Sequence, residues 1–107
     1  MRYFWQGFRN KTSAAVQFKK HVLVLYWEKS DARSEQAKGN MSRLAKRYPT
    51  VRVKLIEVRK DPMKPVRQGV SAFPTVVLLK DGREVDRLAA ETDGATLLEQ
   101  LFRKAQT

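Results

Sequence analysis

Apolar and polar residues follow one another in blocks whose spacing predicts alternating strands and helices. The run HVLVLYW at residues 21–27 is almost wholly apolar, which is typical of a strand buried on both faces. Between residues 31 and 48 the apolar positions recur every three or four residues, as on one face of an amphipathic helix, and Pro49 then ends the pattern. We therefore expect a buried strand at 21–27 followed by a helix over 31–48.

Two further segments have the alternation or the aromatic content of strands. Residues 51–58, VRVKLIEV, alternate and predict a strand with Val51, Val53 and Leu55 on one face. The first six residues, MRYFWQ at 1–6, are rich in aromatic side chains and predict a strand at the start of the chain.

The other helices and one hairpin follow from turn signals and spacing. NKTSAAVQFKKH at 10–21 predicts a first helix, and DPMKPVRQGV at 61–70 predicts a short one. Asp81 and Gly82 stand between the runs PTVVLLK and REVDRLA and predict a hairpin with a type I′ turn. Residues 92–105 predict a closing helix. Its expected apolar stripe consists of Leu97, Leu98, Leu101 and Phe102.

In chain order these segments predict the succession β-α-β-α-β-α-β-β-α. Alternating strands and helices that end in a hairpin and a last helix favour an α/β protein, whose mixed sheet is covered by helices on both faces. The chain has 107 residues, which is enough for one such domain to bury a core. We expect a single domain over residues 1–107.

Composition excludes several kinds of function. The chain has no cysteine, which excludes disulfides, thiolate metal sites and thiol chemistry. The acidic residues are scattered and His21 has no partner at a readable spacing, so we expect no metal, no cofactor and no catalytic residue. The longest apolar run is too short to cross a bilayer, and the first residues lack the apolar core of a signal peptide. We expect a cytoplasmic protein that does not enter a membrane.

Positive charge is abundant and unevenly placed. The formal net charge is +11, and the segment from Lys38 to Arg67 alone has ten basic and two acidic residues. On the predicted helix over 31–48, three basic residues spaced i, i+3 and i+4 lie away from the apolar positions. We call these three residues, Arg43, Lys46 and Arg47, the basic ridge. Such charge either keeps a surface soluble or binds a polyanion such as nucleic acid.

The order of the elements and the motifs between them resemble thioredoxin. The motifs are VLVLYW before the predicted second helix, KDP before the third, GVSAFPT leading into the hairpin, KDGREV at its turn, and the closing amphipathic helix. The resemblance covers nearly the whole chain. It implies a thioredoxin fold, with a mixed five-stranded sheet and helices on both faces. It also implies a cis peptide bond between Phe73 and Pro74.

By this resemblance, the Cys-Gly-Pro-Cys motif of thioredoxins falls on Asp31, Ala32, Arg33 and Ser34. Thiol–disulfide exchange requires a thiolate that attacks a sulfur atom. Neither a carboxylate nor an unactivated hydroxyl performs this step. The resemblance therefore predicts a thioredoxin-like protein that is redox-inactive and is not an enzyme.

Other positions that serve the thioredoxin site differ as well. The buried Asp–Lys pair beneath that site corresponds to Leu25 and Leu55, and we expect apolar packing to replace the ion pair there. The glycine of the loop before the last helix corresponds to Glu91. The proline within the second helix corresponds to Gly39.

The residues around the altered motif have simple structural interpretations. Asp31 would accept hydrogen bonds from the first N–H groups of the helix as an N-cap. Ser34 would be an ordinary surface residue, and Trp27 would pack beside the former site. Arg33 has no structural role of this kind, so we favour it for contact with a partner.

Two functions are compatible with this sequence. The resemblance implies a shallow groove that docks extended peptides partly through backbone hydrogen bonds. Its expected residues, which we call the docking face, are Trp27, Lys29, Arg33, Phe73, Pro74 and Glu91. The leading hypothesis is a protein-binding adaptor, or a subunit of a larger complex, whose partner is another protein. The alternative is a basic protein that associates with nucleic acid or ribonucleoprotein through the segment from Lys38 to Arg67.

Overall fold

The computed structural model describes residues 21–89 and 94–106. Their elements follow in the order predicted for this part of the chain. They are β1 (His21–Trp27), α2 (Ala32–Arg47), β2 (Arg52–Glu57), α3 (Met63–Gln68), β3 (Thr75–Lys80), β4 (Arg83–Ala89) and α4 (Gly94–Ala105). None of these helices is long and apolar enough to cross a membrane. The strand predicted at 1–6 and, apart from His21, the helix predicted at 10–21 lie outside the described residues.

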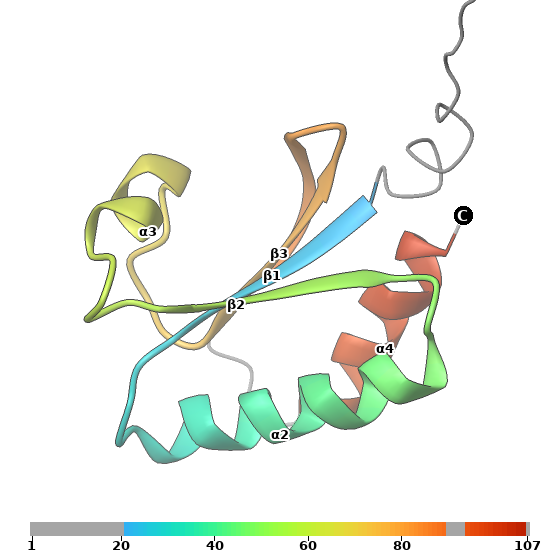
Figure 1. The fold of residues 1–107 in the computed structure, drawn as a ribbon, viewed down its shortest axis with the longest axis horizontal. Helices are drawn as coiled ribbons and strands as arrows, with labels where there is room; N and C mark the ends of the chain where they lie inside the picture. Colours follow the sequence, from blue (N-terminus) through green and yellow to red (C-terminus); the bar gives the residue numbers. More distant parts are fainter. Residues whose placement is uncertain (1–20, 90–93, 107) are drawn as a thin grey trace, which may run out of the picture.

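The strands form one mixed sheet in the order β2-β1-β3-β4. β1 pairs with β2 in parallel, whereas the β1–β3 and β3–β4 pairs are antiparallel. Helices α2 and α4 lie on one side of the sheet and α3 lies on the other (Figure 1). The predicted α/β architecture is therefore confirmed. The described sheet has four strands rather than five, because the residues predicted for the first strand lie outside the described part.

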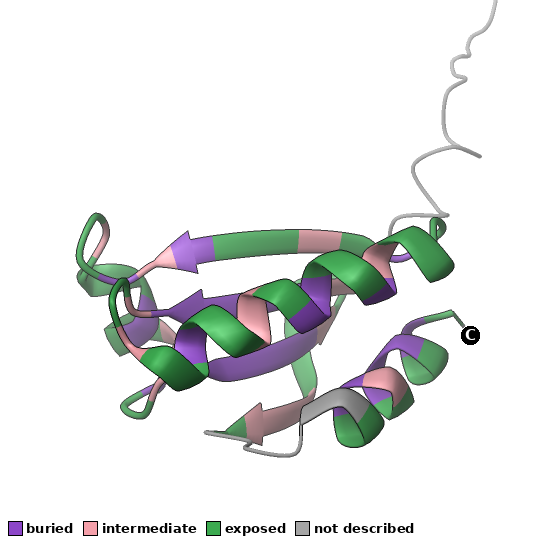
Figure 2. Cartoon of the chain, turned by 90° about the horizontal axis from the view of Figure 1, so that it is seen from below, coloured by how far each residue is buried: buried purple, intermediate pink, exposed green. Residues whose placement is uncertain are grey.

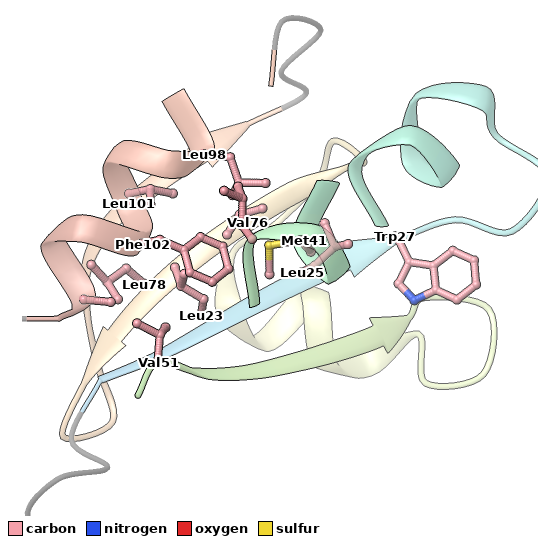
Figure 3. Packing of buried hydrophobic residues seen from close by; sticks show 12 residues of the cluster. Leu23, Leu25, Trp27, Met41, Val51, Val76, Leu78, Leu98, Leu101 and Phe102 are labelled. Atoms are coloured by element: carbon pink, nitrogen blue, oxygen red, sulfur yellow. The ribbon is translucent and has the colours of Figure 1, made fainter. Parts of the chain in front are cut away.

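β1 is an inner strand and buries both its faces, as its continuous apolar run predicts. Leu23 and Leu25 have no exposed surface and belong to the core cluster beneath α2 and α4. Met41 of α2 and Phe102 of α4 converge on them from that side (Figure 3). The two helices are thus fixed to the sheet mainly through the same strand.

The opposite face of the sheet carries a second cluster. Val24 and Tyr26 of β1 pack there with Val77 of β3 and Ile56 of β2. Burial raises the pKa of the Tyr26 hydroxyl above its ordinary value. The segments that flank α3 complete this cluster with Val58, Val70 and the partly buried Phe73.

β2 departs from its predicted burial. Val51, just before it, is buried and Val53 is half-buried, but 42% of Leu55 is exposed. The expectation that Leu55 contributes apolar packing in place of a buried charge is therefore wrong. The physical reason is that β2 lies at the edge of the described sheet and pairs only with β1, where Leu55 is opposite Leu25. Three of the six residues of β2 are accordingly exposed (Figure 2).

The predicted turns are confirmed by their backbone angles. Asp81 and Gly82 have φ values of 52° and 83°, and a type I′ hairpin requires positive φ at both central positions. α3 ends at Gly69, whose φ is 71°. Glycine adopts this left-handed conformation without the steric cost that other residues bear.

Arg87 ties the hairpin to α3. Its guanidinium donates to the carbonyl oxygens of Gln68 and Gly69, each at 3.0 Å, and to both carboxylate oxygens of Glu84 at 2.7 Å. The hydrogen bond from Arg87 holds the pKa of Glu84 below its usual value. The last turn of α3 is therefore held to β4 mainly by Arg87, and the Gln68 amide adds a 3.2 Å hydrogen bond to Glu84.

α4 packs through three of the four residues predicted for its apolar stripe. Leu98, Leu101 and Phe102 are buried, whereas 41% of Leu97 is exposed. Successive residues of a helix point about 100° apart, so Leu97 falls at the border of the face that meets the sheet. The stripe is narrower than predicted.

A shared carboxylate links the ends of α2 and α4. The Tyr48 hydroxyl donates to Glu99 at 2.6 Å, and the guanidinium groups of Arg47 and Arg103 lie 3.1 and 3.6 Å from the same carboxylate oxygen. The Tyr48 ring also packs against Phe102, with ring centroids 5.6 Å apart. The hydrogen bond from Tyr48, together with the two arginine charges, lowers the pKa of Glu99.

We expect acid to weaken the fold partly through Glu99. A carboxyl group with a lowered folded-state pKa stabilises the fold above its unfolded pKa, which is near 4.5. That contribution is lost as the pH falls through the folded-state pKa. In urea unfolding, Glu99→Gln should be less stable than wild type at about pH 7 and should approach it near about pH 3. A difference of equal size at both pH values would contradict this role.

Candidate functional site

The turn that joins β1 to α2 is held by an aspartate side chain. Asp31 has extended backbone angles, with φ −95° and ψ 123°, and its Oδ2 accepts a hydrogen bond from the Ser34 N–H at 2.9 Å. This is the geometry of an N-cap, so the predicted role of Asp31 is confirmed. The turn is closed by a 3.2 Å hydrogen bond from the Asp31 N–H to the Glu28 carbonyl. Ser30, between them, has a φ of 71°.

Ser34 is fully buried, so the prediction that it is ordinary surface is wrong. Its Oγ accepts a hydrogen bond from the Glu28 N–H at 3.0 Å and fixes the start of the turn. The spacing of the sequence contained a signal for this burial. Ser34 precedes Met41 and Tyr48 by one and two heptads, which places it on the same face of the helix as the apolar residues.

Neither polar side chain of the turn is arranged as a nucleophile. The Asp31 carboxylate caps α2, and the Ser34 oxygen is an acceptor for a backbone N–H. A reactive serine needs a base within hydrogen-bond reach, but His21 lies at the other end of β1. The chain also has no thiol, because it has no cysteine. The turn therefore keeps a structured helix N-terminus without a group that can exchange disulfides.

Trp27 is covered by a lysine that the sequence interpretation did not single out. The Lys38 Nζ lies 3.9 Å from the centroid of the Trp27 ring, which is a cation–π contact. Only 9% of Trp27 is exposed. The structural interpretation of Trp27 is therefore favoured over direct contact with a partner. Lys38 follows Ser34 by four residues, and this helical spacing was the available signal.

Three segments meet at the end of the sheet where α2 begins. The Val58 N–H donates to the Trp27 carbonyl at 3.0 Å, which joins the segment after β2 to the end of β1. Thr75 pairs with Tyr26, so the preceding loop reaches the same end. That loop contains the cis peptide bond between Phe73 and Pro74, which the resemblance implied. The structure thus brings the 31–34 turn and this loop together.

The predicted docking face is only partly at the surface. Lys29 and Arg33 are exposed and Phe73 is half-buried, whereas Trp27 and Pro74 are buried. Glu91 lies outside the described residues. Within residues 21–89 and 94–106, the backbone N–H and carbonyl groups of Phe73 form no hydrogen bond.

The basic ridge is less free than its sequence suggests. Arg47 is ion-paired with Glu99 at 3.1 Å, and the Arg43 guanidinium donates to the amide oxygen of Asn40. Lys46 is exposed and has no carboxylate partner in the described ranges. One of the three charges of the ridge is therefore already neutralised within the protein.

A hollow of about 380 Å³ lies beside Trp27 at the edge of the sheet. Leu55, whose exposure was unexpected, forms part of its apolar lining. Three lysines also line it, but Lys60 pairs with Glu57 at 3.8 Å and Lys64 with Asp61 at 3.5 Å. The third lysine is Lys54, which is exposed and has no carboxylate partner in the part of the chain that is described.

The fold and this turn together define a class of protein. It is a thioredoxin-fold domain in which the turn between β1 and α2 has no thiol. The family model for thioredoxin matches residues 8–104. Because the match covers most of the chain, the protein belongs to the thioredoxin family.

Solved thioredoxin structures support the same fold. The thioredoxin of Fasciola hepatica is 24% identical, with 86% of this chain and 88% of that chain covered and a TM-score of 0.73. Mitochondrial thioredoxin 3 of Saccharomyces cerevisiae is 22% identical, with 85% and 84% covered and a TM-score of 0.71. A mutant thioredoxin of Halobacterium salinarum is 20% identical, with 88% and 81% covered and a TM-score of 0.73. A search of the curated proteins found no match.

We predict that Ser34 stabilises the turn through its buried hydroxyl. Ser34→Ala removes the acceptor of a partly buried hydrogen bond from the Glu28 N–H. The free energy of unfolding should therefore fall by about 1–3 kcal/mol. Ser42→Ala, on the exposed side of the same helix, serves as the control and should change stability by less than about 0.5 kcal/mol. Chemical denaturation measures both variants, and equal effects would contradict the structural role of Ser34.

Proposed function

We propose that this protein is a redox-inactive member of the thioredoxin family that works by binding an extended segment of another protein. It would serve as an adaptor, or as a subunit of a larger complex. The observation that carries the proposal is the unpaired backbone of Phe73, next to the capped start of α2. No catalytic residue, cofactor or metal takes part in it.

Loss of redox chemistry and retention of docking are physically separate. Disulfide exchange depends on a thiol, and this chain has none because it has no cysteine. Docking of an extended peptide depends on free main-chain groups and on a shaped surface beside them. The loop that contains Phe73 and Pro74 supplies such groups, and the turn at Asp31 supplies a rigid neighbour. A protein of this kind can therefore bind without reacting.

The alternative function is binding of nucleic acid or ribonucleoprotein through the segment from Lys38 to Arg67. The net charge of +11 favours it. The ion pair of Arg47 with Glu99 and the hydrogen bond of Arg43 to Asn40 reduce what the basic ridge offers to phosphates. We therefore place this function second.

The protein should not reduce disulfides. In an insulin-reduction assay with dithiothreitol, its rate should equal that of buffer, because no residue can form a mixed disulfide. The double variant Asp31→Cys with Ser34→Cys should form a disulfide, but its rate of insulin reduction should be low. Neither Leu25 nor Leu55, which stand at the positions of the thioredoxin Asp–Lys pair, can ionise, and Arg33 stands at the position of the motif's proline. Wild-type turnover in proportion to protein, in a preparation free of reductases, would contradict this prediction.

Peptide docking can be located directly. Peptides selected from a random 12-residue display library would be titrated into ¹⁵N-labelled protein. The largest shifts should fall on the amides of Phe73, Lys29 and Arg33, because main-chain pairing changes the surroundings of those N–H groups.

The basic ridge provides the control for this mapping. The triple variant Arg43→Gln, Lys46→Gln and Arg47→Gln should bind the selected peptides as wild type does. Shifts concentrated on α2 around Arg43 and Lys46, together with loss of binding in this variant, would contradict the proposed site. The nucleic-acid function would then be favoured.

A further inference from the structure

Three exposed cations belong to the segments that meet at the end of the sheet where α2 begins. Lys29 is in the turn after β1, Arg33 is in the first turn of α2, and Arg59 follows β2. We call these three residues the cationic rim. Only the first two were expected from the sequence, since Arg59 reaches this end of the sheet through the fold.

Backbone hydrogen bonds hold the three segments of the cationic rim together. The Val58 N–H bonds to the Trp27 carbonyl at 3.0 Å, which brings Arg59 beside the end of β1. The Asp31 N–H bonds to the Glu28 carbonyl at 3.2 Å, which fixes Lys29 against the start of α2. The rim is therefore a property of the fold and not of a single charged run.

None of the rim cations forms an ion pair with a carboxylate in residues 21–89 and 94–106. The acidic residues around them are mostly engaged. The Asp31 carboxylate caps α2, Glu57 pairs with Lys60, and Asp61 pairs with Lys64. Glu28 and Glu35 are the other two carboxylates near the turn, and neither forms an ion pair with the rim.

The hollow beside Trp27 combines apolar surface with charged side chains, among them the ion-paired Glu57 and Asp61. Leu55 offers exposed apolar surface there, and Lys54 has no carboxylate partner in the described part of the molecule. A peptide that crosses this end of the sheet thus meets unpaired main-chain groups at Phe73, an apolar lining at Leu55, and several uncompensated cations. Complementary charge on a partner lowers the cost of approach and selects against basic partners.

We propose that the segment bound here is acidic, namely an extended peptide in which aspartate or glutamate residues flank an apolar side chain. The carboxylates meet the cationic rim, and the apolar side chain enters the hollow beside Trp27. This inference rests on the proposed function and specifies the chemistry of its partner. Nucleic acid is a different class of partner and is separated from this one by the test.

The test uses the full chain and the same random 12-residue library. Selected peptides should contain aspartate and glutamate about three times as often as the unselected library. Their affinity, measured by fluorescence anisotropy, should fall about tenfold in the triple variant Lys29→Gln, Arg33→Gln and Arg59→Gln. Rising salt should weaken binding to the wild type more than to this variant, since mobile ions screen exposed charges.

A matched control removes the same charge elsewhere. Lys46→Gln, Arg67→Gln and Arg83→Gln also change one lysine and two arginines, all of them exposed and without ion pairs in the described structure. This variant should bind the acidic peptides within about twofold of wild type. Equal loss in both triple variants would mean attraction to the whole positive protein and would overturn the inference.

Other outcomes separate this inference from the function on which it rests. Neutral peptides that shift the amides of Phe73 and Lys29 but do not respond to loss of the rim would keep the docking site and reject its acidic partner. Failure to select any peptide would reject both. A labelled 12-nucleotide single strand that binds through the rim, with no peptide selected, would replace the acidic peptide by nucleic acid.

Discussion

The structure depends on one constraint, which is that β1 must be covered on both faces at once. Leu23 and Leu25 point to α2 and α4, while Val24 and Tyr26 point to the opposite cluster. In the described sheet β3 is also paired on both sides, but it contributes fewer buried residues to the two clusters than β1 does. The positions of the helices, and hence of the turn at the start of α2, follow from this double burial. The turn capped by Asp31 lies at the end of β1, so the burial of β1 also fixes the position of this turn.

Much of this could be predicted from the sequence, because periodicity and turn residues report local structure directly. The helix after Asp31 and the turn at Asp81 are of this kind. The misses concern burial. Leu55 and Leu97 are apolar but exposed, and Ser34 is polar but buried. Residue type does not reveal an edge strand, the border of a helix face, or a hydroxyl that satisfies a backbone N–H.

The candidate site shows the same division between local and tertiary information. Asp31 could be assigned as a cap because its position before a helical pattern is sufficient. Lys38 covers Trp27, and Arg59 reaches the end of β1, only because separate elements fold against one another. A single sequence shows which residues are charged but not where the fold places them. Whether a charge is paired with an opposite charge is also visible only in the structure, as the ion pair of Arg47 with Glu99 demonstrates.

The pairing of β1 has a consequence for how the chain folds. Leu25 of β1, for example, pairs with Leu55 of β2 and with Val76 of β3, and both partners are far from it in the sequence. Of the strand pairs in the described sheet, only the β3–β4 hairpin joins strands that follow one another directly. Long loops must close before the central strand gains any partner, and that closure costs entropy before it yields contacts. The β3–β4 hairpin needs only a two-residue turn to close, whereas both pairings of β1 close much longer loops. We therefore expect β1, and with it the turn at the start of α2, to become ordered only when these distant segments have come together.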